Sequence, residues 1–208
     1  YGISYYFFTD DNFCRNRNWE MILDGLIRLR AKEGIRKYTY TILGEGQMDL
    51  LMSHQAGFSN TVATSGTALA LEQIELLQRL SPNLVVAYDA DAAGFRATER
   101  SAKIAISREM EVKIAQLPRG LDPADLIKKD SDAWKETIKQ ASHIVDFSLG
   151  RIMNEEKDER KRNKRITGGL LRLVSLIKNS VDQSHFISKI SRAANIKEEA
   201  LWIELRKI

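Results

Sequence analysis

Between residues 39 and 117, short runs of apolar and β-branched residues alternate with longer segments whose apolar positions recur at helical spacing. This alternation is typical of a parallel sheet with crossover helices. We predict four strands, each apolar enough to be buried on both faces. They are 39–43, 60–64, 84–88 and 112–117. The helices predicted between them are 47–56, 71–80 and 94–106.

Right-handed crossovers make such strands mutually parallel and bring their carboxyl ends to one edge of the sheet. In open sheets of this kind, ligands bind outside that edge. Acidic residues follow the first, third and fourth predicted strands. A functional site is therefore expected in these three loops.

The pattern after Asp122 is helical, with apolar residues at helical spacing in several segments. These segments are 133–153, 166–177, 186–194 and 198–205. The run 151–165 carries dense charge of both signs, which predicts either a linker or a solvated helix. We predict an α/β fold with a parallel four-stranded sheet flanked by helices, followed by a helical subdomain.

Composition narrows the class of protein without indicating a site. The 208 residues are 43% apolar and 29% charged, as in an ordinary soluble protein. The 32 basic and 28 acidic residues give a net charge of +4, which permits nucleic acid binding without requiring it. The lone Cys14 excludes an internal disulfide and a zinc site in this segment. No apolar run is long enough to cross a membrane, so we expect a cytoplasmic protein.

The first acidic cluster is EGQMD at 45–49, which follows a predicted strand and opens a predicted helix. Gly46 would supply a tight turn, and Glu45 would project from the end of the strand. Taken alone, Glu45 and Asp49 are better explained as acidic residues that complement a helix N-terminus.

The second cluster, DADAAG at 89–94, follows the most apolar strand. Asp89 and Asp91 could converge on one hard cation through their oxygen atoms, as magnesium requires. Alternatively, Asp91 caps a helix and Asp89 lies in a solvated turn. Two carboxylates this close repel each other unless a cation is present, which favours a metal site.

The third cluster is LDPADLI at 121–127. Asp122 and Pro123 suit the start of a helix, and capping alone would explain both residues. However, all three acidic clusters fall on one edge of the predicted sheet. Coincidence explains this arrangement poorly, so a shared site is favoured.

The clusters also carry a resemblance to a known family. Glu45-Gly46 followed by Asp89-x-Asp91-x-x-Gly94 is similar to the Toprim pattern of DnaG-type primases, topoisomerases, and some nucleases and recombination proteins. Three longer strings resemble bacterial replicative primase over residues 23–130. They are EGQMDLLMSHQAGFSNTVATSGTALA, DADAAGFRATER and LPRGLDPADLIKK.

The resemblance implies a DNA primase core fragment, a nucleotidyltransferase that makes short RNA primers on single-stranded DNA during replication by two-metal phosphoryl transfer. Glu45 would be a catalytic residue in acid–base chemistry or metal binding. Asp89 and Asp91 would be catalytic and bind metal, and Asp122 would also be a ligand. The cofactor would be Mg²⁺ or Mn²⁺, which binds nucleotide phosphates and lowers the pKa of the primer 3′-hydroxyl.

The resemblance also divides the chain and implies partners. Residues 1–38 would be a poorly defined remnant of the preceding core, 39–130 the Toprim catalytic domain, and 131–208 the helical subdomain that closes the core. Partners would be the single-stranded DNA template, ribonucleoside triphosphates and, through a region not present here, the replicative helicase. Because the chain begins at Tyr1 rather than at a methionine, we expect it to start inside a longer protein.

The resemblance is incomplete in the third cluster. Many family members have a second aspartate two residues after the position of Asp122, but this chain has Ala124, with Asp125 one step further. Asp125 is therefore a candidate ligand through a shifted helix start, or the second metal is weakly held. Ala70 also stands where a threonine helix cap is usual, a loss of about 1 kcal/mol.

Four further residues are candidates for contacts with phosphate or nucleic acid. Arg96 and Arg100 lie one helical turn apart and either face phosphates or form a solvated helix face. Ser65 and Thr67 follow the second strand and either approach the site through backbone groups or form an ordinary turn.

Two other functions stay open. A Toprim nuclease would use the same metal cluster to activate water against a phosphodiester. A non-catalytic Toprim scaffold would bind DNA with a degraded metal site, and Ala124 keeps this alternative open. Because the basic amino-terminal half of the polymerase core is missing, this fragment alone need not be active.

Overall fold

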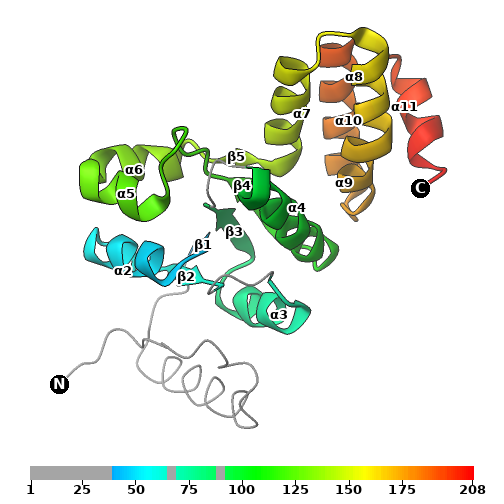
Figure 1. Ribbon diagram of the computed structural model, residues 1–208. Helices are drawn as coiled ribbons and strands as arrows, with labels where there is room; N and C mark the ends of the chain where they lie inside the picture. Colours follow the sequence, from blue (N-terminus) through cyan, green and yellow to red (C-terminus); the bar gives the residue numbers. More distant parts are fainter. Residues whose placement is uncertain (1–38, 65–68, 88–91) are drawn as a thin grey trace.

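The computed structural model describes residues 39–64, 69–87 and 92–208, with only the backbone described for 92–98. A five-stranded sheet is flanked by helices and followed by a bundle of helices (Figure 1). The strands are β1 Thr41–Gly44, β2 Thr61–Ala63, β3 Asn83–Val86, β4 Glu111–Ile114 and β5 Ser142–His143. The helices of the sheet region are α2 Gln47–Gln55, α3 Leu71–Leu80, α4 Ala92–Ser107, α5 Pro123–Lys129 and α6 Ser131–Lys139.

The strand order is β2-β1-β3-β4-β5. The first four strands are parallel, with Leu43 of β1 opposite Val62 on one side and Val86 on the other. The predicted α/β fold with its parallel strands and intervening helices is confirmed, although the strands are shorter than predicted. The fifth strand, β5, is antiparallel to β4 and was not predicted.

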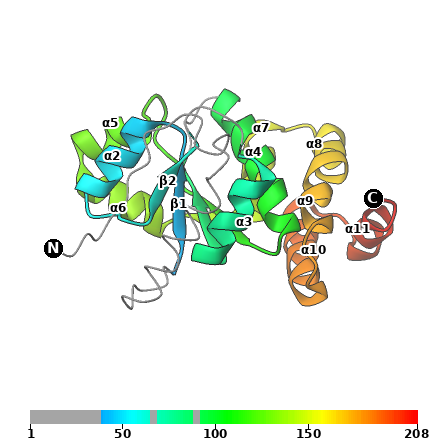
Figure 2. The same ribbon diagram turned by 90° about the horizontal axis from the view of Figure 1, so that it is seen from below.

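Alternate side chains of the strands enter two separate cores, one on each face of the sheet. Ile42 and Val85 join a core with Trp134 of α6, while Leu43 and Leu84 point to the opposite face. Helices α2, α5 and α6 therefore cover one face, and α3 and α4 cover the other (Figure 2). This arrangement accounts for the apolar runs in β1 and β3, which are buried on both faces.

The prediction that every strand is buried on both faces is wrong for β4. Val112 and Ile114 are buried, while Glu111 and Lys113 are exposed. The buried residues lie on the face covered by α4 and by the helix that follows β5. The other face of β4 is left to solvent, so its residues alternate between apolar and charged.

The segment 133–153, predicted as helical from its spacing, contains two helices with a short strand between them. Helix α6 ends at Lys139, and Ser142–His143 pair with β4 before α7, Ile144–Glu155, begins. The His143 Nδ1 atom accepts a hydrogen bond from the Val145 N–H at 3.2 Å and so caps α7. The residues on both sides of this strand have helical spacing, and two residues are too few to show a strand pattern of their own.

The remaining helices form a bundle that packs on the same face as α3 and α4. They are α8 Glu159–Arg165, the π-helix η2 Ile166–Leu170, α9 Leu171–Ser175, α10 Ser180–Ala194 and α11 Glu198–Leu205. None of the residues of α8 is buried, so the charged run forms a solvated helix there. Among the described residues, no helix has the length and apolarity needed to span a bilayer.

The N-terminus of α3 lacks a side-chain cap. Ala70 is the capping residue, and only the reverse bond is made, from the Ala70 N–H to Gln73 Oε1 at 2.8 Å. We expect Ala70→Thr to raise the free energy of unfolding by about 1 kcal/mol, because the hydroxyl would accept a backbone N–H of the first turn. Urea denaturation with an unchanged m-value would measure this gain.

A matched control is Ala193→Thr, at an exposed position inside α10. Threonine there should lower the free energy of unfolding by about 0.5 kcal/mol, because it is a weaker helix former than alanine. If Ala70→Thr lowered the free energy of unfolding by as much as Ala193→Thr, the interpretation of Ala70 as an unfavourable capping residue would be wrong.

Candidate metal centre

The direction of the chain changes at the carboxyl ends of β1 and β3. After β1 the chain enters α2 on one face and returns through β2, and it then crosses to β3 on the other side of β1. The helix after β3, α4, covers the opposite face. The carboxyl ends of β1 and β3 therefore flank the crevice in which open parallel sheets bind their ligands.

Glu45 follows β1 directly and is half-buried at this crevice. Its backbone is held by the strand next to it. The Thr64 N–H donates to the Gly44 carbonyl at 3.2 Å, and the Thr64 hydroxyl donates to the Glu45 carbonyl at 3.5 Å. The backbone that carries the Glu45 side chain is thus fixed from β2.

Asp49, in the first turn of α2, connects two loops that are far apart in sequence. Only 5% of its surface is exposed. Its Oδ2 atom accepts the Gly46 N–H at 2.9 Å, and its Oδ1 atom accepts the Ala124 N–H at 3.1 Å. One buried carboxylate therefore joins the turn after β1 to the start of α5, 75 residues away.

Two glycines make room for this carboxylate. A Cβ atom on Gly44 would lie 3.2 Å from the Asp49 Cβ, and one on Gly46 would lie 3.3 Å from Asp49 Oδ2. Gly46 has φ −102° and ψ 158°, a conformation open to any residue. It is therefore needed for the close approach of Asp49, and not for the turn geometry that we predicted.

Asp122 is the N-cap of α5, as predicted. Its Oδ1 atom accepts the Asp125 N–H at 2.6 Å, and Pro123 occupies the first turn. The helix starts directly after Asp122, which leaves Asp125 exposed in its first turn. The role of Asp125 as a metal ligand remains a prediction.

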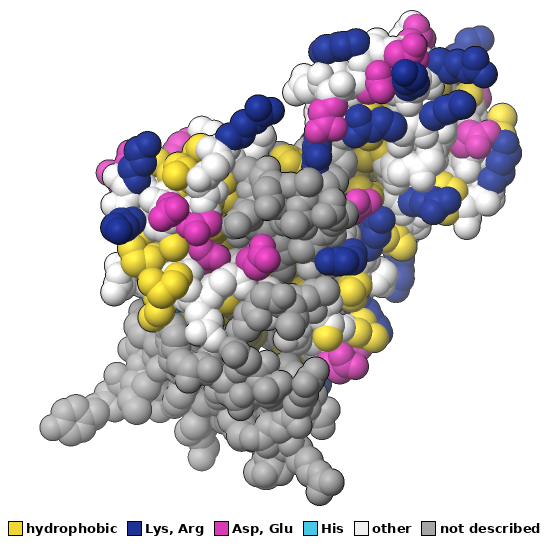
Figure 3. Space-filling model, viewed as in Figure 1, with side chains coloured by type: hydrophobic (Ala, Val, Ile, Leu, Met, Phe, Trp, Pro, Cys, Tyr) yellow, Lys and Arg dark blue, Asp and Glu magenta, His cyan; other side chains and the backbone are white. Residues whose placement is uncertain are grey.

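Asp122 lies close enough to Asp49 for its charge to affect the pKa of Asp49. Burial raises the pKa of the Asp49 carboxyl, the N–H groups of Gly46 and Ala124 lower it, and the negative charge of Asp122 raises it again. Among the described residues, no basic side chain shifts this pKa. Figure 3 shows a group of acidic side chains on this face where α2 and α5 meet. A divalent cation would relieve their repulsion.

Several predicted site residues lie outside the described residues. They are Asp89, Asp91, Ser65 and Thr67, together with the side chain of Arg96. Arg100 is exposed on α4. Within the described ranges, no three acidic, histidine or cysteine side chains gather as a metal-binding group. Of the predicted ligands, the structure describes Glu45, Asp122 and Asp125, and Asp49 binds the backbone beside the first two through Gly46 and Ala124.

The sequence did not reveal the role of Asp49, which we had assigned to the helix dipole. Its carboxylate instead makes a long-range contact to a backbone N–H, which leaves no periodic pattern. The available signal was the pair Gly44 and Gly46, since two small residues beside an aspartate indicate a close approach.

The raised pKa of Asp49 gives a test by pH. Because its folded-state pKa exceeds the unfolded value, the proton favours the folded state, and this stabilisation is lost as the pH rises through the folded pKa. We expect the free energy of unfolding of the wild type, minus that of Asp49→Asn, to fall as the pH rises above about 4, the ordinary pKa of an aspartate. Urea titrations with a chelator present would measure this difference, and a difference that rises with pH would refute the assignment.

Comparisons with known proteins identify relatives of part of this chain. Residues 42–127 match the family model described as Toprim-like. A DNA primase of Clostridium acetobutylicum is 32% identical over 164 residues, which cover 77% of this chain and 27% of that relative. The chain thus spans about a quarter of the length of this curated relative.

Solved primase structures share the fold. The zinc-binding and RNA polymerase domains of the Aquifex aeolicus primase match with a TM-score of 0.67 and 26% identity, over 83% of this chain and 41% of that one. A DnaG primase catalytic domain bound to single-stranded DNA matches with a TM-score of 0.69 and 22% identity, over 85% of this chain and 57% of that one. The chain therefore contains a Toprim-like domain related to bacterial DnaG-type primases, with the fold of their catalytic core.

Proposed function

We propose that this chain is part of a DNA primase core that, within the longer protein, synthesises RNA primers on single-stranded DNA. The observation that carries the proposal is the buried Asp49 carboxylate, which binds the backbone next to Glu45 and Asp122 at one edge of the sheet. Among the described residues, no basic side chain offsets its charge. Carboxylates grouped in this way are more stable with a bound divalent cation than without one.

The order of the strands supports a shared set of ligands. Strand β3 lies between β1 and β4, and its continuation is hydrogen-bonded to β1 through the Ala87 N–H and the Leu43 carbonyl at 2.8 Å. Asp89 and Asp91 follow Ala87 by two and four residues in the sequence. The proposed ligands of Mg²⁺ or Mn²⁺ are thus Glu45, Asp89, Asp91 and Asp122, with Asp125 as a further candidate.

Each protein group has a distinct proposed role. A bound divalent ion would supply charge neutralisation at the nucleotide phosphates and lower the pKa of the primer 3′-hydroxyl. Glu45, on a backbone fixed by Thr64, would bind metal or hold a proton at its carboxylate. Asp49 is a positioning residue, because both of its oxygen atoms are used to align the loops of Glu45 and Asp122.

The partners follow from the same proposal. The substrates are ribonucleoside triphosphates and a single-stranded DNA template, and one primase relative of this fold was solved with single-stranded DNA. Arg96, Arg100, Ser65 and Thr67 are proposed phosphate contacts. The remainder of the longer protein would provide the rest of the polymerase core and the contact with the replicative helicase in the cytoplasm.

A non-catalytic DNA-binding scaffold is the second candidate. Ala124 contributes only its backbone N–H, to Asp49, at a position where many relatives of this type would place another carboxylate. A site with one ligand fewer would hold its second metal weakly.

Calorimetric titration with manganese tests the proposal. We expect saturable binding to the wild type, and in Asp89→Ala plus Asp91→Ala an affinity loss greater than the roughly 10- to 100-fold that follows removal of an outer-shell partner. Asp125→Ala and Asp132→Ala form a matched pair, since both aspartates are exposed in the first turn of a helix. Only Asp125→Ala should weaken binding if Asp125 is a ligand.

Labelled single-stranded DNA then separates the functions. Nucleotide-dependent primer products, lost in the Asp89 and Asp91 variant, support the primase. Cleavage of the DNA without nucleotides would support the nuclease instead. Absence of manganese binding to the wild type would refute the metal centre and favour the scaffold.

A further inference from the structure

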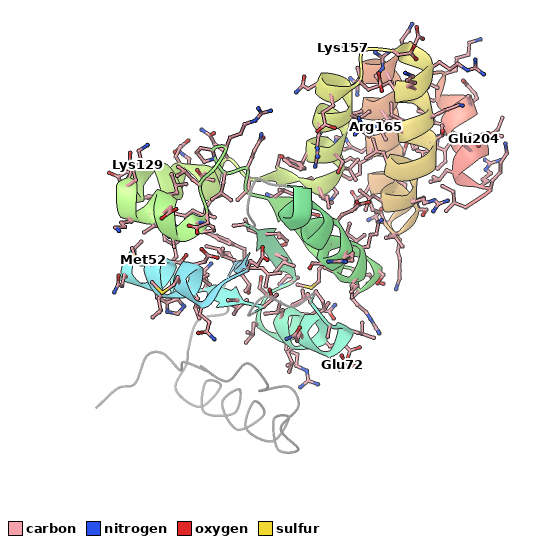
Figure 4. The ribbon with its side chains drawn as sticks, viewed as in Figure 1. Met52, Glu72, Lys129, Lys157, Arg165 and Glu204 are labelled. Carbon is pink, nitrogen blue, oxygen red and sulfur yellow. The ribbon has the colours of Figure 1, made fainter. Side chains whose placement is uncertain are left out.

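A second charged surface lies in the helical bundle, on the exposed side of α8 and η2. The sequence of α8 is ERKRNKR, with five basic residues and one acidic residue, and none of them is buried. Figure 3 shows Lys and Arg side chains spread over this part of the molecule. Figure 4 labels Lys157, which lies just before α8, and Arg165, the last residue of α8. We define the α8–η2 surface as Arg160, Lys161, Asn163, Lys164 and Thr167, with the adjoining Gly168 and Gly169.

Four acidic residues lie near this surface, and one of them, Glu159, lines it and makes no ion pair among the described residues. Asp158 accepts the Lys161 N–H at 2.8 Å, and Glu156 accepts the Asp158 N–H at 3.0 Å. Glu155 binds Arg165 at 2.8 Å and also pairs with Arg151. Among the described residues, Arg160, Lys161 and Lys164 make no ion pair, so their charges face solvent.

The surface has a shallow, open depression. This depression of about 450 Å³ is lined by Glu159, Arg160, Asn163, Lys164 and Thr167. The polar atoms open to a ligand here are those of the exposed Arg160 and Lys164 side chains, which lie one helical turn apart.

The glycines of η2 are not explained by packing. Gly168 and Gly169 are exposed, and a Cβ atom on either would meet nothing within 4 Å. Glycine destabilises a helix interior relative to alanine. A bare backbone lets a ligand approach closely, and π-helical turns often occur at functional sites.

We propose that the α8–η2 surface binds the phosphodiester backbone of a single-stranded nucleic acid. The unpaired basic side chains match its regularly spaced negative charge. The segment 159–170 contains no aromatic residue on which bases could stack, so binding should not depend on base sequence. The choice of nucleic acid over another polyanion rests on the proposed primase function, but binding at this surface needs no metal.

Fluorescence anisotropy with labelled oligothymidylate in a chelator-containing buffer tests the proposal on the full chain. Arg160→Gln plus Lys164→Gln should weaken binding about 25-fold at 0.1 M salt and reduce the slope of log K against log salt by about 1.4. Each lost contact to a single strand contributes about 0.7 to this slope. The matched control is Lys197→Gln plus Arg206→Gln, which removes the same charge from exposed positions around α11.

Gly168→Ala plus Gly169→Ala separates binding from folding. The added methyl groups meet no protein atom, so the thermal midpoint should stay the same or rise, while affinity for the oligonucleotide should fall severalfold. Unchanged binding in both surface variants, or an equal loss in the α11 control, would overturn the proposal. The chelator removes any metal from this assay, whereas the manganese titration does not depend on α8 or η2. A failed metal centre and a failed α8–η2 surface therefore give different results.

Discussion

The buried side chain of Asp49 is the contact on which the described part of the site depends. Its two oxygen atoms accept N–H groups from Gly46 and Ala124, and so fix the loop after β1 against the start of α5. Strand pairing alone cannot do this, because β3 separates β1 from β4. A short acidic side chain with two small neighbours thereby sets the spacing of Glu45 and Asp122.

This contact has an electrostatic consequence. Among the described groups, burial and the charge of Asp122 oppose ionisation of Asp49, and backbone N–H groups favour it. The bonds that align the two loops thus hold a carboxylate where its charged form is disfavoured. In the proposed metal centre, a bound cation would offset this cost.

The main architecture could be predicted because buried parallel strands and amphipathic helices leave strong periodic patterns. The α3 bounds and the capping of α5 by Asp122 were both evident from the residues. The short strand β5 was not, because two residues such as Ser142 and His143 carry no period of their own. Asp49 was missed for a similar reason, since a contact over 75 residues is invisible to local spacing.

The strand β5 also determines how the helical bundle relates to the sheet. His143 pairs with Lys113 of β4, caps α7, and stacks on Phe186 of α10 at 4.4 Å between ring centroids. One continuous core runs from Leu43 and Val86 of the sheet to Ile187 and Leu201 of the bundle. The sheet and the bundle are therefore expected to unfold together. The bundle is a poor unit for recombination or transplantation, because separating it would expose apolar surface on both fragments.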